Sequence, residues 1–178
     1  LGGCQTKDGR ETRWQSLLRA DDLCRLTPAG EQALLRYGVR TVIDLRWPAD
    51  ADTHPNFLYK TPGALHHQAL SLLGASVEAW QAVRALGPKE QFNCLVLQHF
   101  QAELRTVFQA IAAAPPGGVL FHCVSGKDRT GVVAALLLAL AEVETETIVE
   151  DYGRSTAKLS EAYLAAYPDE QAATIERV

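Results

Sequence analysis

Residues 118–131 have the sequence Gly118-Val119-Leu120-Phe121-His122-Cys123-Val124-Ser125-Gly126-Lys127-Asp128-Arg129-Thr130-Gly131, and they decide the fold of the chain around them. The apolar run at 118–121 predicts a buried strand, and the apolar residues at 132–143 predict a buried helix. The decapeptide between them, 122–131, then forms a tight loop and a helix start. Such an arrangement binds anions, because backbone amides curl around an oxyanion and the positive end of the helix faces it.

Two side chains of this loop have the chemistry for attack at phosphorus. A thiol beside a helix N-terminus and cationic neighbours has a pKa of roughly 3.5–7.5, so we expect Cys123 to be an ionised nucleophile at neutral pH. Arg129 follows after five intervening residues, and a loop that closes on itself brings its guanidinium over the thiolate. The planar fork of arginine can bind two phosphate oxygens at once, a task for which lysine is less suited.

The string His-Cys-x-x-Gly-Lys-Asp-Arg-Thr-Gly at 122–131 resembles the Cys-x5-Arg signature of the cysteine-dependent phosphatases. It is most similar to the bacterial branch called tyrosine phosphatase family 3, which includes proteins active on phosphotyrosine and on phosphoinositides. Three stretches among the first fifty residues resemble further motifs of that family. They are Leu1-Gly2-Gly3, Leu18-Arg19-Ala20-Asp21-Asp22-Leu23 and Gly38-Val39-Arg40-Thr41-Val42-Ile43-Asp44-Leu45-Arg46.

The resemblance implies a protein-tyrosine-phosphatase-like α/β fold, in which helices flank a central, mostly parallel sheet. We expect one phosphatase domain over residues 1–178, because this length with 47% apolar residues suffices for one substantial core. An N-terminal β-hairpin is expected, closed by a two-residue turn at Asp8-Gly9 and using the β-forming residues 12–18. Since Leu1-Gly2-Gly3 resembles only the end of a longer family motif, we expect the N-terminus to be truncated.

The other elements are predicted from apolar periodicity, caps and turn residues. Helices are expected from the N-cap Thr27 to Gly38, and at 76–86, 95–114, 146–152 and 156–167. Strands are expected at 39–45 and 65–70, and a polar loop that lines the pocket is expected at Pro48–Pro55. The apolar stripe of the 95–114 helix, which includes Leu97, is expected to face the core.

Composition and charge exclude several classes of protein. A net charge of −4 and a pI of about 5.7 argue against a nucleic-acid binder, so a local positive site must attract an anionic substrate. The longest apolar run is too short to span a bilayer, so no integral membrane segment is expected. No cysteines have the spacing of a metal site, and His66 and His67 would face opposite sides of a strand. We therefore expect no metal and no cofactor, and the oligomeric state is left open.

The cysteine spacing also bears on the compartment. Four cysteines without paired spacing favour reduced thiols and hence the cytoplasm. A secreted protein is not excluded, because an export signal could precede the truncated N-terminus.

The remaining loop residues are expected to bind substrate or to support the loop. Binding is assigned to Val124, Ser125, Gly126, Lys127 and Thr130, of which Lys127 favours substrates with more than one phosphate, such as phosphoinositides. Thr130 is expected to donate a hydrogen bond to the cysteine sulfur, and His122 to orient the loop.

Asp44 is a carboxylate in a predicted buried strand, where it would be costly without a partner. Two interpretations stay open. One is an ion pair or capping contact within the core. The other, suggested by the family resemblance, is that Asp44 or Arg46 braces the phosphate loop from the neighbouring strand.

The predicted reaction is hydrolysis of a phosphomonoester through a phosphocysteine intermediate on Cys123. The expected partner is a phosphorylated protein or a phosphoinositide: phosphotyrosine is the first candidate, followed by phosphoserine, phosphothreonine and phosphoinositides. The general acid is assigned to Asp128, with Asp50, Asp52 and Glu78 as alternatives, because no aspartate lies between residues 53 and 127. The alternative function is a catalytically weak phosphate-binding pseudophosphatase. Residues 77–86 are either a fixed surface helix or part of a mobile lid.

Overall fold

The computed structural model describes residues 1–55, 65–74, 77–87 and 91–157. Within this part of the chain, four parallel strands form one sheet in the order β1-β4-β2-β3. The strands are β1 (Leu17–Ala20), β2 (Val39–Asp44), β3 (His66–Ala69) and β4 (Gly118–His122). The expected α/β fold is therefore confirmed, and the strand before the catalytic loop lies inside the sheet rather than at an edge.

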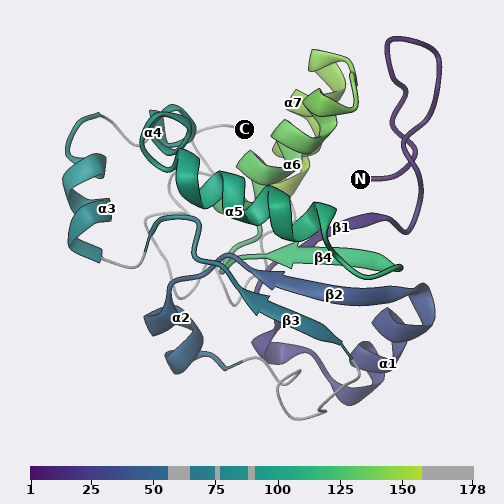
Figure 1. The fold of residues 1–178 in the computed structure, drawn as a ribbon, viewed down its shortest axis with the longest axis horizontal. Helices are drawn as coiled ribbons and strands as arrows, with labels where there is room; N and C mark the ends of the chain where they lie inside the picture. The colour runs from purple at the N-terminus through teal and green to yellow at the C-terminus, as the bar shows by residue number, and fades with distance from the viewer. Residues whose placement is uncertain (56–64, 75–76, 88–90, 158–178) are drawn as a thin grey trace.

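Helices cover both faces of the sheet (Figure 1). One face carries α4 (Phe92–His99), α5 (Gln101–Ala112), α6 (Asp128–Leu140) and α7 (Thr145–Ala157). The other carries the 3-10 helix η1 (Leu23–Arg25) and α1 (Pro28–Tyr37), whereas α2 (Pro48–Thr53) and α3 (Val77–Arg84) lie near the ends of the strands. Of the helices described, none is both long and apolar enough to cross a membrane.

The two central strands divide the core between the two faces of the sheet. Val42 pairs with Leu120 and Ile43 pairs with Phe121. The two side chains of each pair therefore point to the same face of the sheet, and the two pairs point to opposite faces. Ile43 and Phe121 pack under α4, α5 and α6, whereas Val42 and Leu120 pack in a second cluster with residues of η1 and α1. This double burial explains why Val42 and Ile43 of β2 and the three residues 119–121 of β4 are all apolar.

Helix α1 confirms its predicted caps. The Thr27 hydroxyl accepts a hydrogen bond from Gly30 N at 3.1 Å, and Pro28 occupies the first helical position. Gly38 ends the helix with a φ of 106°, a left-handed conformation that glycine adopts without steric cost. The chain then enters β2 directly.

The N-terminal hairpin is smaller than expected. Gly9 N donates to Thr6 O at 2.9 Å, so the central residues of the turn are Lys7 and Asp8 rather than the predicted Asp8 and Gly9. In the described part of the chain, a single antiparallel bridge from Gln5 to Glu11 joins the two arms. Of the predicted second arm at 12–18, Thr12 pairs with the first arm, its N–H donating to Cys4 O at 2.9 Å, whereas Leu17 and Leu18 pair with β4 and so become partly buried.

The polar loop expected at Pro48–Pro55 is instead the short helix α2. Pro48 occupies its first position, where the missing N–H costs no hydrogen bond, and Ala51 N donates to Trp47 O at 3.1 Å. The segment has no buried residue within the helix, so no apolar stripe marked it as helical. Its expected place after β2 is confirmed.

The helix expected at 95–114 is two helices, α4 and α5, which meet at Phe100. This residue has a φ of −119° and a ψ of 38°, and its buried ring lies 6.1 Å from that of Trp80 between centroids. The break rotates one helix relative to the other, so Leu97 is 40% exposed and does not join the buried stripe.

The last two helices differ from their predicted bounds. Helix α6 begins at Asp128, earlier than the 132–143 predicted from the apolar run alone. The segments expected at 146–152 and 156–167 are joined in α7 as far as Ala157, and the rest of the second lies outside the described residues.

Candidate active site

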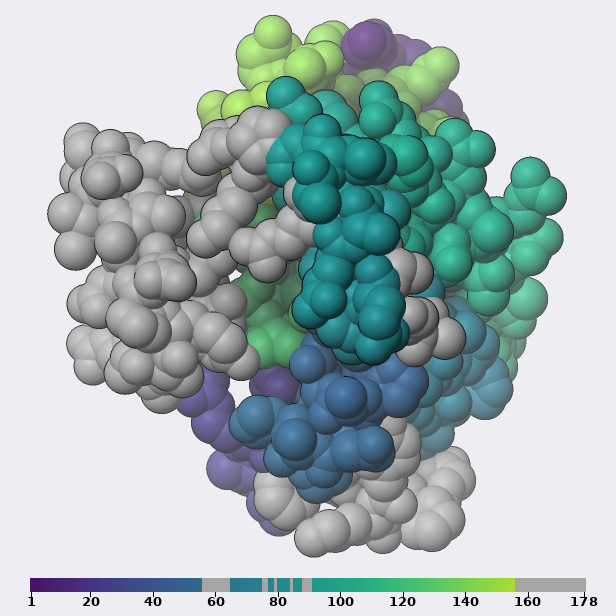
Figure 2. Space-filling model, turned by 90° about the vertical axis from the view of Figure 1, so that its left-hand side faces the viewer, coloured from purple at the N-terminus to yellow at the C-terminus, as the bar shows by residue number. Residues whose placement is uncertain are grey.

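The loop after β4 lies at the carboxyl edge of the sheet. β4 ends at His122 and α6 begins at Asp128, so residues 123–127 form the loop between them. Leu45 N donates to His122 O at 2.9 Å, which continues the pairing with β2 up to the start of the loop. Figure 2 shows this edge, where green atoms of the end of β4 and the start of α6 lie in a hollow between α2 in blue and α3 and α4 in teal.

Two carbonyl groups of the loop point outwards, and this turns the following amides inwards. Val124 O accepts a hydrogen bond from Asp22 N at 3.0 Å, and Gly126 O accepts one from Arg19 Nη2 at 2.8 Å. The described peptide bonds are all trans, so the N–H of the next residue points to the opposite side, into the loop. The backbone thus presents donors toward the centre of the loop.

Helix α6 begins without a capping side chain. Lys127 is the N-cap residue but its side chain makes no capping bond, and the first hydrogen bond of the helix runs from Gly131 N to Lys127 O at 2.7 Å. The amides of residues 128–130 precede that bond, and a helix leaves such amides unsatisfied. Together with the positive end of the helix dipole, they complete an anion site.

Cys123 is a free thiol at the start of this loop, and it is 1% exposed. Thr130, the third residue of α6, is fully buried, and its hydroxyl has no hydrogen-bond partner among the described residues. The bond expected from Thr130 to the cysteine sulfur is therefore not formed in this structure. An unpaired buried hydroxyl is costly, so Thr130 retains a donor for a group that enters the loop.

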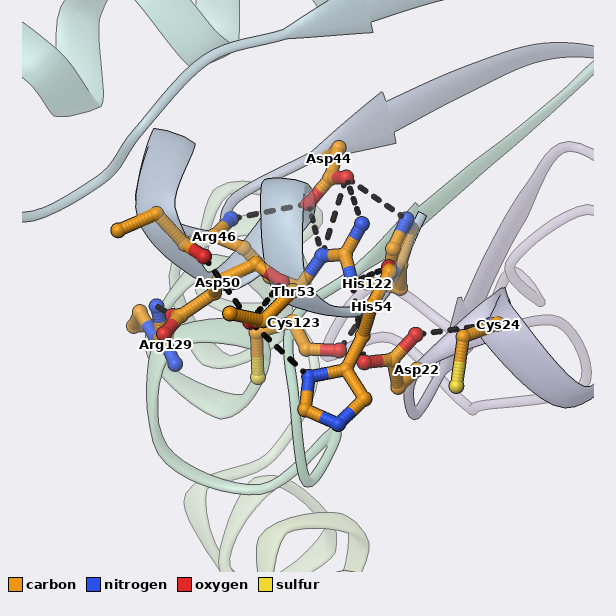
Figure 3. Close-up of polar contacts among 11 residues, drawn as sticks. Asp22, Cys24, Asp44, Arg46, Asp50, Thr53, His54, His122, Cys123 and Arg129 are labelled. Carbon is orange, nitrogen blue, oxygen red and sulfur yellow. Dashed lines mark hydrogen bonds and ion pairs between the residues drawn. The ribbon is translucent and has the colours of Figure 1, made fainter. Parts of the chain in front are cut away.

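Arg129 is held at the same edge of the sheet by two residues around the start of α2. Its Nη1 lies 3.3 Å from Asp50 Oδ2, and its guanidinium carbon lies 5.5 Å from the ring centroid of Trp47. The arginine side chain is only 13% exposed. Figure 3 shows the Asp50 carboxylate beside Arg129, with Cys123 close by. The structure thus brings together the two residues of the Cys-x5-Arg pattern at one anion site.

Asp44 and Arg46 form a buried ion pair behind the loop (Figure 3). Arg46 Nη2 donates to Asp44 Oδ2 at 2.7 Å, and Arg46 Nη1 donates to Asp22 Oδ2 at 3.0 Å. Because the N–H of Asp22 also holds Val124 O, the ion pair is connected to the loop through one residue. The two interpretations of Asp44 therefore coincide: the pair fills a core position and also contacts a residue that supports the loop.

His122 lies between this ion pair and Cys123. Its Nδ1 is 3.2 Å from Cys123 O and its Nε2 is 3.7 Å from Asp44 Oδ2. Burial lowers the pKa of His122, against the opposing effect of the Asp44 charge. Burial alone would raise the pKa of Asp44, but the hydrogen bonds from Arg46 and its charge outweigh burial and leave this pKa lowered.

These shifts predict that the protein loses stability on acidification. A buried histidine that stays neutral binds no proton in the folded protein, whereas the same histidine in the unfolded chain binds one. The free energy of unfolding therefore falls as the pH drops below about 6.5. His67, whose pKa burial also lowers, acts in the same direction. We expect the melting temperature to fall between pH 7.5 and 5.5, and His122→Gln to flatten this dependence, whereas exposed His99→Gln does not. An unchanged slope in His122→Gln would contradict the assignment.

Asp128 has a well-defined partner in α7. The Tyr152 hydroxyl donates to Asp128 Oδ1 at 3.1 Å, and burial, followed by the Asp128 charge, raises the pKa of Tyr152 to about 12. Tyr152 therefore stays protonated and remains a donor at neutral pH. Its ring lies against Gly131, where an added Cβ would approach within 2.4 Å, so glycine is required at this position.

The four candidate acids lie in different places. Asp128 is held by Tyr152 at the first position of α6, and Asp50 contacts Arg129. Asp52 on α2 and Glu78 on α3 are exposed. Helix α3 packs through Trp80, which is 8% exposed beside Phe92, and its action as a lid stays a prediction.

Several residues around the loop were not singled out by the sequence. Arg19 and Asp22 lie in a stretch that carries the family resemblance, so a signal existed for them. Asp151 and Tyr152 on α7 pair with Arg19 and Asp128. Trp47 carried no signal, because its contact with Arg129 depends on the path of the chain after β2.

Comparison with known proteins identifies the family of the chain. The family model described as tyrosine phosphatase family matches residues 1–177. A tyrosine-protein phosphatase of Nostoc commune is 39% identical over 155 residues, which cover 86% of this chain and 51% of that protein. The triple specificity protein phosphatase PtpB of Mycobacterium tuberculosis is 31% identical over 168 residues, which cover 78% of this chain and 60% of that protein.

The chain thus spans only 51% and 60% of the length of these two relatives. A crystal structure of P. aeruginosa TpbA in complex with pTyr is similar at a TM-score of 0.43 and 18% identity, covering 80% of this chain and 70% of that one. A likeness of this degree carries no argument by itself. The match over residues 1–177 is sufficient: the chain belongs to the tyrosine phosphatase family.

Proposed function

We propose that this chain hydrolyses phosphomonoesters through a phosphocysteine intermediate. The observation that carries the proposal is the arrangement of one loop. Inward amides, an uncapped helix N-terminus and the Arg129 side chain meet at the loop that Cys123 begins. Donors of this kind stabilise the negative charge that spreads over the equatorial oxygens of a transferring phosphoryl group.

The reaction has two steps. In the first, the Cys123 thiolate attacks phosphorus, an S–P bond forms, the P–O bond to the leaving group breaks, and the leaving oxygen takes a proton from a carboxylic acid. In the second, water attacks the phosphocysteine, the S–P bond breaks, the carboxylate takes a proton from that water, and inorganic phosphate leaves. The thiolate and the acid are regenerated, and Arg129 holds the phosphoryl oxygens throughout.

Asp128 is our first candidate for the acid. Tyr152 fixes Oδ1 of its carboxyl group and leaves Oδ2 without a partner among the described residues. The position of Asp128 at the first residue of α6 places this carboxyl group at the proposed phosphate site. Asp50 is the second candidate, because its contact with Arg129 also places a carboxyl group beside the bound phosphate.

We expect Asp128→Asn to lower kcat about 10²-fold or more for an alkyl phosphate, and much less for para-nitrophenyl phosphate. The reason is that nitrophenolate leaves readily without a proton, whereas an alkoxide does not. Asp50→Asn is the matched comparison, and it should lower both rates to a similar extent. A leaving-group-dependent loss in Asp50→Asn alone would move the acid to that residue.

The proposed substrates are phosphotyrosine in proteins, and then phosphoserine, phosphothreonine or phosphoinositides. Two relatives, a tyrosine-protein phosphatase and a triple specificity protein phosphatase, support this order. Free thiols at all four cysteines support a reducing compartment such as the cytoplasm, because the mechanism requires reduced Cys123. Phosphate release from a panel of phosphopeptides and phosphoinositides tests the proposal, and phosphate binding without turnover of para-nitrophenyl phosphate would identify a pseudophosphatase.

A further inference from the structure

The peptide between Gly126 and Lys127 joins the glycine of the loop to the N-cap residue of α6. Gly126 has a φ of 67°, in the left-handed region that glycine enters without steric cost. An added Cβ would lie 2.7 Å from Ala20 O and 2.8 Å from Asp21 N, so another residue does not fit. Gly126 has no side chain that would resist rotation of this peptide, so the contact of its carbonyl group helps to set the orientation of the peptide.

That contact is the guanidinium of Arg19 on β1. Arg19 Nη2 donates to Gly126 O at 2.8 Å and to Ser155 Oγ at 2.6 Å. Arg19 Nη1 donates to Asp151 Oδ2 at 2.7 Å, and the arginine side chain is 14% exposed. One partly buried guanidinium therefore connects the loop to α7, and its two partners there, Asp151 and Ser155, hold it in position.

The other outward carbonyl of the loop is held differently. Val124 O accepts its hydrogen bond from the backbone N–H of Asp22, which no substitution except proline removes. Gly126 O depends on a side chain. Of these two supports for the loop, the Arg19 contact is thus the one that a mutation can remove while the backbone stays intact.

We propose that Arg19 is a positioning residue that keeps the Lys127 N–H pointed at the bound phosphate, and that α7 sets this position through Asp151 and Ser155. The inference rests on the proposed function of the loop as a phosphate site. When the charged donor is absent, the peptide can turn so that Gly126 O faces the anion. A donor is then replaced by an acceptor, which repels the phosphate oxygens.

The test measures oxyanion binding apart from catalysis. Arg19→Met removes the donors and keeps the length of the side chain, and Arg19→Lys restores one charged donor group. Arg154→Met on α7 is the control, because its arginine forms only an exposed pair with Glu150 at 4.0 Å among the described contacts. Tungstate affinity is measured by calorimetry for each, with kcat and KM for para-nitrophenyl phosphate and a thermal melt.

We expect Arg19→Met to weaken tungstate binding about tenfold to a hundredfold, to raise KM and to lower kcat, with Arg19→Lys in between. Asp151→Asn, which leaves Arg19 present but less firmly held, should weaken binding by a smaller factor. Arg154→Met should match the wild type. Tungstate affinity within twofold of wild type in a folded Arg19→Met protein would overturn the proposal.

Two further outcomes are separable from these. If Arg19→Met does not fold, Asp151→Asn and Arg19→Lys decide, and unchanged tungstate affinity in both overturns the proposal. If the wild-type protein binds tungstate but releases no phosphate from any substrate, the proposed function fails. The comparison of tungstate affinities between wild type and Arg19→Met still decides the role of Arg19 in that case.

Discussion

Cys123→Ser is expected to abolish phosphate release, with a loss of at least about 10³-fold in kcat for para-nitrophenyl phosphate. A serine hydroxyl is not ionised at neutral pH, so it cannot replace the thiolate as nucleophile. The loop amides and Arg129 remain, so inorganic phosphate and tungstate should bind with nearly unchanged affinity. Phosphate release and calorimetry measure the two effects separately.

A second cysteine provides the control for this experiment. Cys94 on α4 is a free, exposed thiol, so Cys94→Ser should leave kcat and KM within about twofold of wild type. Trapping after rapid acid quench should detect a phosphoenzyme in Cys94→Ser and none in Cys123→Ser. Turnover in Cys123→Ser equal to wild type would eliminate the covalent mechanism.

Arg129→Ala is expected to lower kcat/KM for para-nitrophenyl phosphate about 10³-fold or more, and to weaken tungstate binding as well. The substitution removes the guanidinium that follows the phosphoryl oxygens into the transition state. It also leaves Asp50 without its partner at the site, so a negative charge then faces the incoming dianion. Steady-state kinetics and calorimetry measure both losses.

Arg129→Lys separates the charge from the planar fork. It retains a cation near Asp50 but can no longer bind two oxygens in parallel, so a loss of about 10²-fold in kcat/KM is expected. Arg10→Lys, which changes an exposed pair with Asp8 far along the chain from the loop, should have no effect. Full activity in Arg129→Lys would show that charge alone suffices.

The catalytic strand, loop and helix could be predicted from residues 118–131 because their conformation is decided locally. Four apolar residues, a loop that ends in Asp128 and an apolar helix leave few alternatives for the backbone. Thr27, Pro28 and Gly38 likewise determine the ends of α1 through contacts within a few residues. Such signals depend only on residues that are close together in the sequence, so they can be recognised before the fold is known.

Other elements are decided by contacts that no local window contains. Phe100 interrupts a helical pattern because its ring packs against Trp80, and β1 forms at 17–20 because β4 is available as a partner. Helix α2 was missed for a different reason: its residues are polar, and only the proline at its first position signalled a helix start.

The sequence by itself determined the nucleophile, the arginine and the strand, loop and helix that carry them, because these lie within one short segment and depend on backbone geometry. Only the tertiary structure decided what supports that segment. Arg129 meets Asp50 across 79 positions, and Arg19 meets Gly126 across 107. These residues become neighbours because the parallel strands bring their carboxyl ends to one edge of the sheet. That proximity cannot be seen in a local sequence pattern.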